Sequence, residues 1–326
     1  YPNDFRPTHN TAEAVSKFHE CREEDLPSVA KDISLAGRIM GIRKFGKASF
    51  FHLQDRRGRL QVYARKDRLG DEGYALFQSF DVGDIVGVSG HLFRTKTKEL
   101  TLEAESVRLL AKCLRPLPEK WHGLADVEAR YRQRYVDLMV NPEVRDVFET
   151  RSRILRLVRK FFEQRDFLEV ETPMMQAIPG GAAARPFTTH HNALDLELFL
   201  RIAPELFLKR LLVGGIERVF ELNRNFRNEG ISIKHNPEFT MLEWYRAHTD
   251  YTAMMDDCTA LLRHVATTLG IDQYRYRGKA ADPFADWHRI SVAEAFDHYA
   301  GIDLSAWLED VEGFRAAIGE LGIRTA

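Results

Sequence analysis

The stretch from Arg218 to Tyr245, RVFELNRNFRNEGISIKHNPEFTMLEWY, constrains the fold of this chain more than any other. Its two halves, Val219 to Arg227 and Phe239 to Tyr245, alternate their side chains like strands. The segment between them is polar and contains a glycine, an asparagine and a proline, which are typical of loops. The stretch therefore predicts an antiparallel hairpin with a long, charged loop.

The alternation also predicts which groups share one side of the hairpin. Residues two positions apart lie on the same face of a strand, so Arg227, Phe239, Glu243 and Tyr245 are expected to line one pocket. An arginine fork, an aromatic ring and a carboxylate suit a phosphate, a flat base and a cation. A solvated hairpin without a ligand is the alternative interpretation.

FRNE followed by HNPEFTMLEWY resembles motif 2 of the class II aminoacyl-tRNA synthetases, in the version found in lysyl-tRNA synthetases. The resemblance extends from about Asp4 to Asp250. It implies a lysine–tRNA ligase that activates L-lysine with ATP and Mg²⁺ and transfers it to tRNA(Lys). The implied fold is α+β, with an N-terminal OB-fold β-barrel followed by a class II antiparallel-sheet catalytic domain, here incomplete.

The same resemblance assigns roles to individual residues. It makes Arg227 the catalytic residue, facing the α-phosphate and the substrate carboxylate. It places the ATP site at Arg227, Glu229, His235, Asn236 and Phe239, and the lysine site at Gly181, Glu205, Glu243 and Tyr245. Phe239 is expected to stack on adenine, Glu205 and Gly181 to meet the α-ammonium, and Glu243 and Tyr245 to hold the ε-ammonium. A buried acid selects a cationic side chain, which argues against the aspartyl and asparaginyl enzymes.

Five strand-like runs precede this region, with one helix between the third and the fourth. They are Ile33 to Met40, Ser49 to Asp55, Arg59 to Ala64, Asp84 to Leu92 and Leu100 to Leu109, and the helix lies near Tyr74 to Phe80. This order is typical of an OB-fold barrel. With a short polar helix around Thr11 to Glu24, it predicts an OB-fold domain over residues 1–113, a Pro-containing linker over 114–123 and a catalytic domain over 124–326.

The barrel sequence is locally basic. Between Arg38 and Arg68, lysines and arginines face only two acids, Asp55 and Asp67. Basic charge beside an exposed aromatic is how proteins bind single-stranded nucleic acid, although a solvated basic face on a structural barrel is the alternative. By resemblance, the anticodon site consists of Arg43, Phe50, Gln61 and Glu99.

A second pair of elements resembles class II motif 1, which builds the dimer interface in that family. Glu143 to Gln164 is predicted to be a helix with one buried face, and Phe167 to Thr172 is predicted to be extended up to Pro173. The resemblance implies a homodimer, while an ordinary core helix and strand explain the pattern equally well. Leu200 to Leu212 is predicted to begin as a strand and become a helix, with Glu205 at the turn.

Composition excludes several classes of protein. The net charge of −1 gives no overall field that attracts nucleic acid, so such contacts must be local. Three distant cysteines and the adjacent His190 and His191 suggest neither a zinc site nor a disulfide framework. No apolar run approaches the ~20 residues that span a bilayer, so a cytoplasmic protein with no membrane partner is expected.

Part of the family pattern is missing after Asp250. Nothing there resembles motif 3 or the magnesium-binding carboxylates, so we expect a C-terminally truncated sequence whose own residues include no metal ligand. Two alternatives to a tRNA enzyme follow. One is a lysine ligase that modifies a protein, of the elongation factor P type, which lacks the OB barrel. The other is a non-catalytic RNA-binding fragment.

Overall fold

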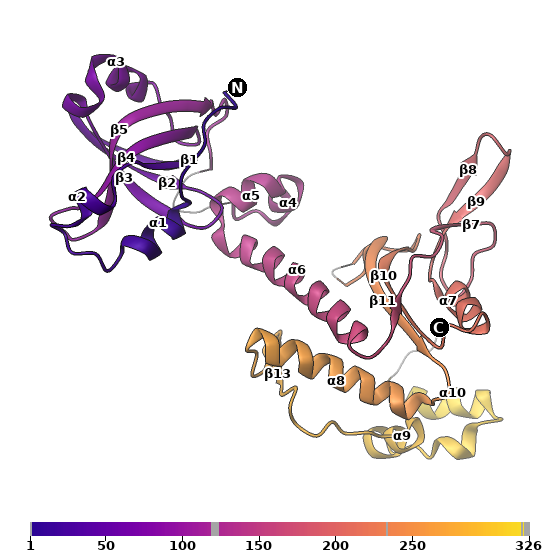
Figure 1. Ribbon diagram of the computed structural model, residues 1–326. Helices are drawn as coiled ribbons and strands as arrows, with labels where there is room; N and C mark the ends of the chain where they lie inside the picture. Colours follow the sequence, from indigo (N-terminus) through magenta and orange to yellow (C-terminus); the bar gives the residue numbers. More distant parts are fainter. Residues whose placement is uncertain (1, 119–123, 233, 321, 323–326) are drawn as a thin grey trace. The chain divides into compact units, whose positions relative to one another are not determined.

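The computed structural model describes residues 2–118, 124–232, 234–320 and 322 (Figure 1). The chain divides into two compact units, Tyr1–Val147 and Phe148–Ala326, and each is described by itself. The expected linker over residues 114–123 falls partly outside the described residues, since 119–123 are not described.

The first unit is built around a closed five-stranded barrel in the order β1-β2-β3-β5-β4. Its elements are α1 (Thr11–Phe18), α2 (Leu26–Val29), β1 (Ile33–Phe45), β2 (Ala48–Gln54), β3 (Arg59–Arg65), α3 (Lys66–Gln78), β4 (Ile85–Arg94) and β5 (Leu100–Ala111). A helix between the third and fourth strands of a closed barrel is the OB-fold arrangement, so that prediction is confirmed.

Alternation along the strands fills the barrel. Phe51 and Leu53 of β2 and Val62 of β3 are fully buried, and Phe77 of α3 packs against them. The residues between them therefore point outward, which leaves polar and aromatic side chains on the outer face of β2 and β3.

Some boundaries differ from the predicted ones. The expected helix over Thr11 to Glu24 is wrong in its length: α1 ends at Phe18, and α2 starts separately with Pro27 in its first turn, where proline is favoured. β1 continues past Met40 to Phe45 through an irregularity between Ile39 and Gly41, which bends the strand without ending it.

Three helices follow the barrel: α4 (Val127–Arg132), α5 (Arg134–Val140) and α6 (Pro142–Glu163). Asp137 is fully buried and accepts hydrogen bonds from Arg130, Arg134 and Asn141, which fixes the turn between α4 and α5. α6 confirms the helix predicted over Glu143 to Gln164. The extended segment predicted after it is shorter as a strand than expected, because only β6 (Leu168–Glu169) pairs with a neighbour.

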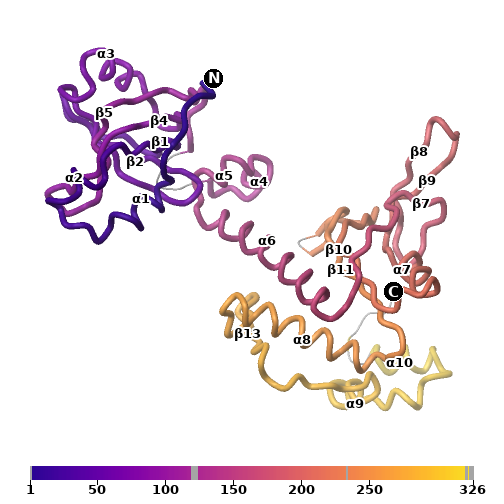
Figure 2. The backbone as a smooth tube through the Cα atoms, viewed as in Figure 1, coloured from indigo at the N-terminus to yellow at the C-terminus, as the bar shows by residue number. Residues whose placement is uncertain are grey.

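The second unit contains the predicted hairpin, formed by β10 (Arg218–Phe226) and β11 (Glu238–Arg246). It lies in the sheet β11-β10-β6, and a second sheet has the order β7-β9-β8, with β7 (Met175–Gln176), β8 (Thr188–His191) and β9 (Leu196–Leu200). Figure 2 shows the chain passing from β9 into α7 (Glu205–Val213) and on into β10. The remaining elements are α8 (Tyr251–Leu269), β12 (Tyr274–Tyr276), β13 (Lys279–Ala281), α9 (Val292–Ala300), η1 (Leu304–Trp307) and α10 (Val311–Glu320).

The core of this unit lies on one face of the hairpin. Phe220 of β10 and Trp244 of β11 pack with Phe161 and Phe162 of α6 and with Leu261 of α8. Phe162 stacks on Phe220 with ring centroids 4.8 Å apart. Because helices cover this face, any ligand site on the hairpin must use the opposite one.

Candidate functional site

The strand register places three of the four predicted pocket residues on that opposite face, while Arg227 follows directly after the end of β10. Glu221 pairs with Glu243 across the hairpin, Val219 pairs with Tyr245 and Asn225 with Phe239. Residues directly opposite in an antiparallel pair project to the same side. The prediction that Phe239, Glu243 and Tyr245 share a face is therefore confirmed.

A buried ion pair lies beneath this face. Arg201 and Glu221 are almost inaccessible to solvent, and Nη1 of Arg201 lies 2.6 Å from Oε1 of Glu221. Arg201 also donates to the carbonyl oxygens of Thr172 and Arg224, and the Thr172 hydroxyl donates to Glu221. The pair thus ties β10 to the segments that follow β6 and β9. Sequence reasoning missed it, although an arginine inside the apolar run FLRIA was a signal.

The Glu243 carboxylate has no cationic partner of its own in the described part of the chain. It is half-buried, and the Tyr245 hydroxyl donates a 2.9 Å hydrogen bond to Oε1. Burial raises the pKa of Glu243, and the nearby Glu205 and Glu221 carboxylates raise it further, against the hydrogen bond from Tyr245 and the positive charge of Lys209. Burial likewise raises the pKa of the Tyr245 hydroxyl, so the tyrosine stays a donor. This corner of the pocket is acidic and suits a cation.

A second carboxylate approaches the same pocket from α7. Glu205 is the first residue of that helix, as expected, and it lies against Gly181. Gly181 has a φ of +91°, and a Cβ on it would come within 2.9 Å of the Glu205 Cβ, so only glycine fits here. Nζ of Lys209, one turn along α7, lies 2.5 Å from Oε1 of Glu205 and 5.7 Å from the centre of the Tyr245 ring. Sequence reasoning did not assign Lys209.

The predicted nucleotide side is only partly assembled. The Arg227 guanidinium lies 5.2 Å from the centre of the Phe239 ring, and its Nε is buried without a partner among the described residues. An unpaired buried donor beside an aromatic ring suits an anion attached to a flat base.

The other three predicted ATP residues are exposed, and the structure joins none of them to Arg227 or Phe239 by a hydrogen bond in the described ranges. Glu229 accepts from the backbone N–H of Arg185 at 3.3 Å. His235 contacts the Ser232 hydroxyl at 2.9 Å, and Asn236 lies between His235 and Pro237 in the same loop. These contacts order the loop near its ends.

The four predicted anticodon residues lie on one outer surface of the barrel. Arg43 of β1 is opposite Phe50 of β2, which is opposite Tyr63 of β3. The Phe50 and Tyr63 rings stack with centroids 4.5 Å apart and planes 22° apart. Nε2 of Gln61 donates to Oε2 of Glu99 at 3.0 Å. The stacking of Tyr63 on Phe50 was not predicted from the sequence.

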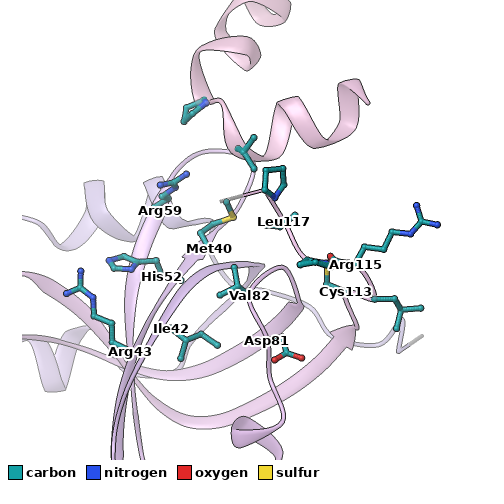
Figure 3. Close-up of a pocket in the computed structure, with 16 residues that line it drawn as sticks. Met40, Ile42, Arg43, His52, Arg59, Asp81, Val82, Cys113, Arg115 and Leu117 are labelled. Carbon is teal, nitrogen blue, oxygen red and sulfur yellow. The ribbon is translucent and has the colours of Figure 1, made fainter. Parts of the chain in front are cut away.

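A hollow of about 890 Å³ adjoins this surface in the first unit (Figure 3). Arg43, His52 and Arg59 line it together with apolar side chains such as Met40 and Val82. Since Arg43 belongs to both, the basic face continues from the stacked aromatics into the hollow.

No metal site competes with these assignments. In the part of the chain that the structure describes, no three His, Cys, Asp or Glu side chains are grouped so that they could hold a metal ion. His190 lies 3.3 Å from Asp195 at the β8–β9 turn, in keeping with a structural interpretation. None of the described helices is both long and apolar enough to cross a membrane.

Two protein families match this sequence. The family described as tRNA synthetases class II (D, K and N) matches residues 126–312, and the OB-fold nucleic acid binding domain matches residues 33–110. The first match covers both strands of the hairpin and α7, and the second covers the barrel.

Curated relatives resemble nearly the whole chain. A lysine–tRNA ligase of Carboxydothermus hydrogenoformans is 54% identical over 99% of this chain and 65% of its own length. The lysine–tRNA ligase of Pelotomaculum thermopropionicum is 56% identical over 97% of this chain and 61% of its own length. That of Dichelobacter nodosus is 57% identical over 92% of this chain and 60% of its own length. The chain therefore spans somewhat less than two thirds of the length of these relatives.

Proposed function

This chain belongs to the class II tRNA synthetases of the D, K and N group, and from that premise we propose that it serves as a lysine–tRNA ligase. The observation that carries the proposal is Glu243, a half-buried carboxylate with a raised pKa and a tyrosine donor that forms no ion pair with any residue the structure describes. A site for aspartate would not present an acid to the substrate side chain, because the two carboxylates would repel each other. A site for asparagine would leave that acid without a cationic partner.

The lysine substrate is proposed to lie along the exposed face of the hairpin. Its ε-ammonium pairs with Glu243 while the Tyr245 hydroxyl keeps that carboxylate oriented. Its α-ammonium meets Glu205 beside Gly181, where the absence of a Cβ lets the backbone approach. Two carboxylates separated along one face then bind the two ammonium groups of the substrate, which favours lysine over shorter or neutral amino acids.

ATP is proposed to bind at the other end of the face. Phe239 stacks on the adenine, and the unpaired Nε of Arg227 and its guanidinium face the α-phosphate and the lysine carboxylate. Glu229, His235 and Asn236 follow on the loop and are proposed to border the nucleotide. Bidentate arginine contacts suit both a phosphate and a carboxylate.

The reaction then needs positioning more than a covalent nucleophile. A lysine carboxylate oxygen attacks the α-phosphorus, the bond to the β-phosphate oxygen breaks, and pyrophosphate leaves with its electron pair. Arg227 balances the charge that develops on the α-phosphoryl oxygens. A ribose hydroxyl of the tRNA 3′ adenosine then attacks the lysyl carbonyl, loses its proton, and AMP departs. The described residues offer no metal ligand set, so no step is assigned to Mg²⁺ here.

The tRNA partner is proposed to be read by the barrel. A base stacks on Phe50, whose ring itself stacks with Tyr63. The Gln61 amide and the Glu99 carboxylate, already joined by a hydrogen bond, offer an edge for base recognition, and Arg43 offers a phosphate or base contact. A homodimer through α6 and β6, in the cytoplasm where tRNA is charged, completes the proposal.

Two alternatives are disfavoured by different features. A protein-modifying lysine ligase lacks the barrel, and an RNA-binding fragment would not need the acidic residues of the hairpin face. Isothermal titration of the chain with L-lysine, L-methionine, L-aspartate and L-asparagine tests the lysine site and so separates a lysine ligase from the fragment. Binding of lysine alone supports the proposal. No binding of lysine, or tighter binding of aspartate, overturns it.

A further inference from the structure

Three carboxylates, Glu205, Glu221 and Glu243, lie close enough to influence one another, and the chain itself supplies ion-pair partners for two of them. Glu221 is paired with the buried Arg201. Glu205 is paired with Lys209, at 2.5 Å. Among the described residues Glu243 has no ion pair and accepts from the Tyr245 hydroxyl, although the Lys209 charge also acts on it. The pocket without substrate is thus one positive charge short, while lysine carries two ammonium groups.

The position of Lys209 makes its pairing more than a surface ion pair of helix α7. Its ammonium reaches Glu205 and also lies 5.7 Å from the Tyr245 ring, whose hydroxyl orients Glu243. It is about half exposed, so it can leave without breaking a buried contact. Arg210, the next residue, instead stacks on Phe207 and has no part in the acidic cluster.

We propose that Lys209 is a specificity-determining residue that holds the α-ammonium position on Glu205 until the amino acid displaces it. This inference rests on the proposed function. The exchange of one ammonium for another keeps Glu205 paired in the absence of substrate. A ligand therefore gains at Glu205 only if it brings an ammonium of its own. Ligands that lack the α-ammonium leave Lys209 in place and gain nothing there.

The test uses three ligands that differ in their ammonium groups. Lys209→Met keeps the stem and removes the charge, so L-lysine no longer competes for Glu205. Because exposed ion pairs are weak, its dissociation constant should fall by roughly two- to fivefold. 6-Aminohexanoate, which lacks the α-ammonium, should change by less than about 1.3-fold. L-norleucine, which lacks the ε-ammonium, should gain as L-lysine does.

Two controls separate this role from a structural one. Lys209→Arg restores a cation and should return L-lysine affinity to the wild-type value, and Arg210→Met removes a neighbouring cation and should leave all three constants unchanged. Unchanged or weaker L-lysine binding by Lys209→Met, or an equal gain for 6-aminohexanoate, would overturn the inference. Failure of the wild-type chain to bind L-lysine at all would instead count against the proposed function.

Discussion

Glu243 is the residue on which the amino-acid assignment depends. Its raised pKa means that ionisation of this carboxyl opposes folding at neutral pH, as expected for an acid kept for a ligand. A raised pKa gives a stabilising contribution that is complete below the ordinary value of 4.5 and is lost as the pH rises through the folded-state pKa.

Glu243→Gln should therefore raise the melting temperature of the chain at pH 7, and the difference from wild type should shrink as the pH falls towards 4.5. It should also weaken L-lysine binding, by about 2 to 4 kcal/mol or roughly 30- to 1000-fold, because the ε-ammonium loses its partner. Thermal melts and titrations across pH 5 to 8 measure both effects.

The pH dependence of L-lysine affinity tests the same carboxylate independently of the melting temperature. Wild-type affinity for L-lysine should fall as the pH drops through the raised pKa of Glu243, and Glu243→Gln should lack this step. Glu197→Gln, which changes an exposed acid on β9, is the matched control. A Glu243→Gln chain that melts lower than wild type at pH 7, or binds lysine normally, would show that another acid reads the side chain.

Phe50 is the corresponding residue on the barrel. Phe50→Ala removes one ring of the stack with Tyr63, so an RNA hairpin with a UUU anticodon should bind more weakly by about 1 to 3 kcal/mol, or roughly 5- to 150-fold. Gel-shift titration at fixed salt measures it, with circular dichroism to show that the barrel is intact. Tyr276→Ala removes an exposed aromatic of the second unit as a control. Equal affinities for wild type and Phe50→Ala would exclude stacking.

At the scale of elements, the Arg201–Glu221 pair joins β10 to the chain after β6 and β9. Arg201→Met should destabilise the second unit by ~3 to 5 kcal/mol, because it leaves a buried carboxylate uncompensated. Adding Glu221→Leu should recover much of that loss. Urea unfolding of the two single variants and the double variant gives the coupling energy. Additive losses would mean that the pair does not act as a unit.

Helix α6 carries the oligomer prediction. Val147 is 65% exposed and Leu168 of β6 is 53% exposed. Exposed apolar side chains are expected at a surface that a partner subunit covers. We expect an isologous homodimer that Val147→Asp weakens at least tenfold and Asp146→Asn leaves intact. Light scattering over a dilution series checks this. A wild-type chain that is monomeric at tens of micromolar would contradict it.

Across the whole molecule, the features that could be predicted from the sequence are those set by local alternation of side chains. Period-two alternation identified the barrel strands and the hairpin, and the hairpin's face followed from it without knowledge of any partner. It could not predict what depends on contacts between distant residues. Arg201 meets Glu221 only because β9 and β10 come together. The Lys209–Glu205 pair is local by contrast, since its spacing of four residues fits the predicted helix, and it could have been found from the sequence.

The predicted ends of some helices and strands were wrong, because periodicity does not determine where an element ends. α1 ends at Phe18 although a helix was expected up to Glu24, and the irregularity after Ile39 lets β1 continue to Phe45 where a strand end was expected at Met40. In the site, Glu229, His235 and Asn236 carry no pattern that fixes their side chains, because a polar loop has no core to pack against.

The central claim is that this protein activates lysine, and amino-acid-dependent ATP–pyrophosphate exchange by the complete gene product measures it most directly. With saturating ATP and each of the twenty amino acids in turn, only L-lysine should support rapid exchange, and Glu243→Gln should lower kcat/KM for L-lysine by roughly 30- to 1000-fold. Exchange driven by aspartate or asparagine, or no exchange with lysine, would contradict the account.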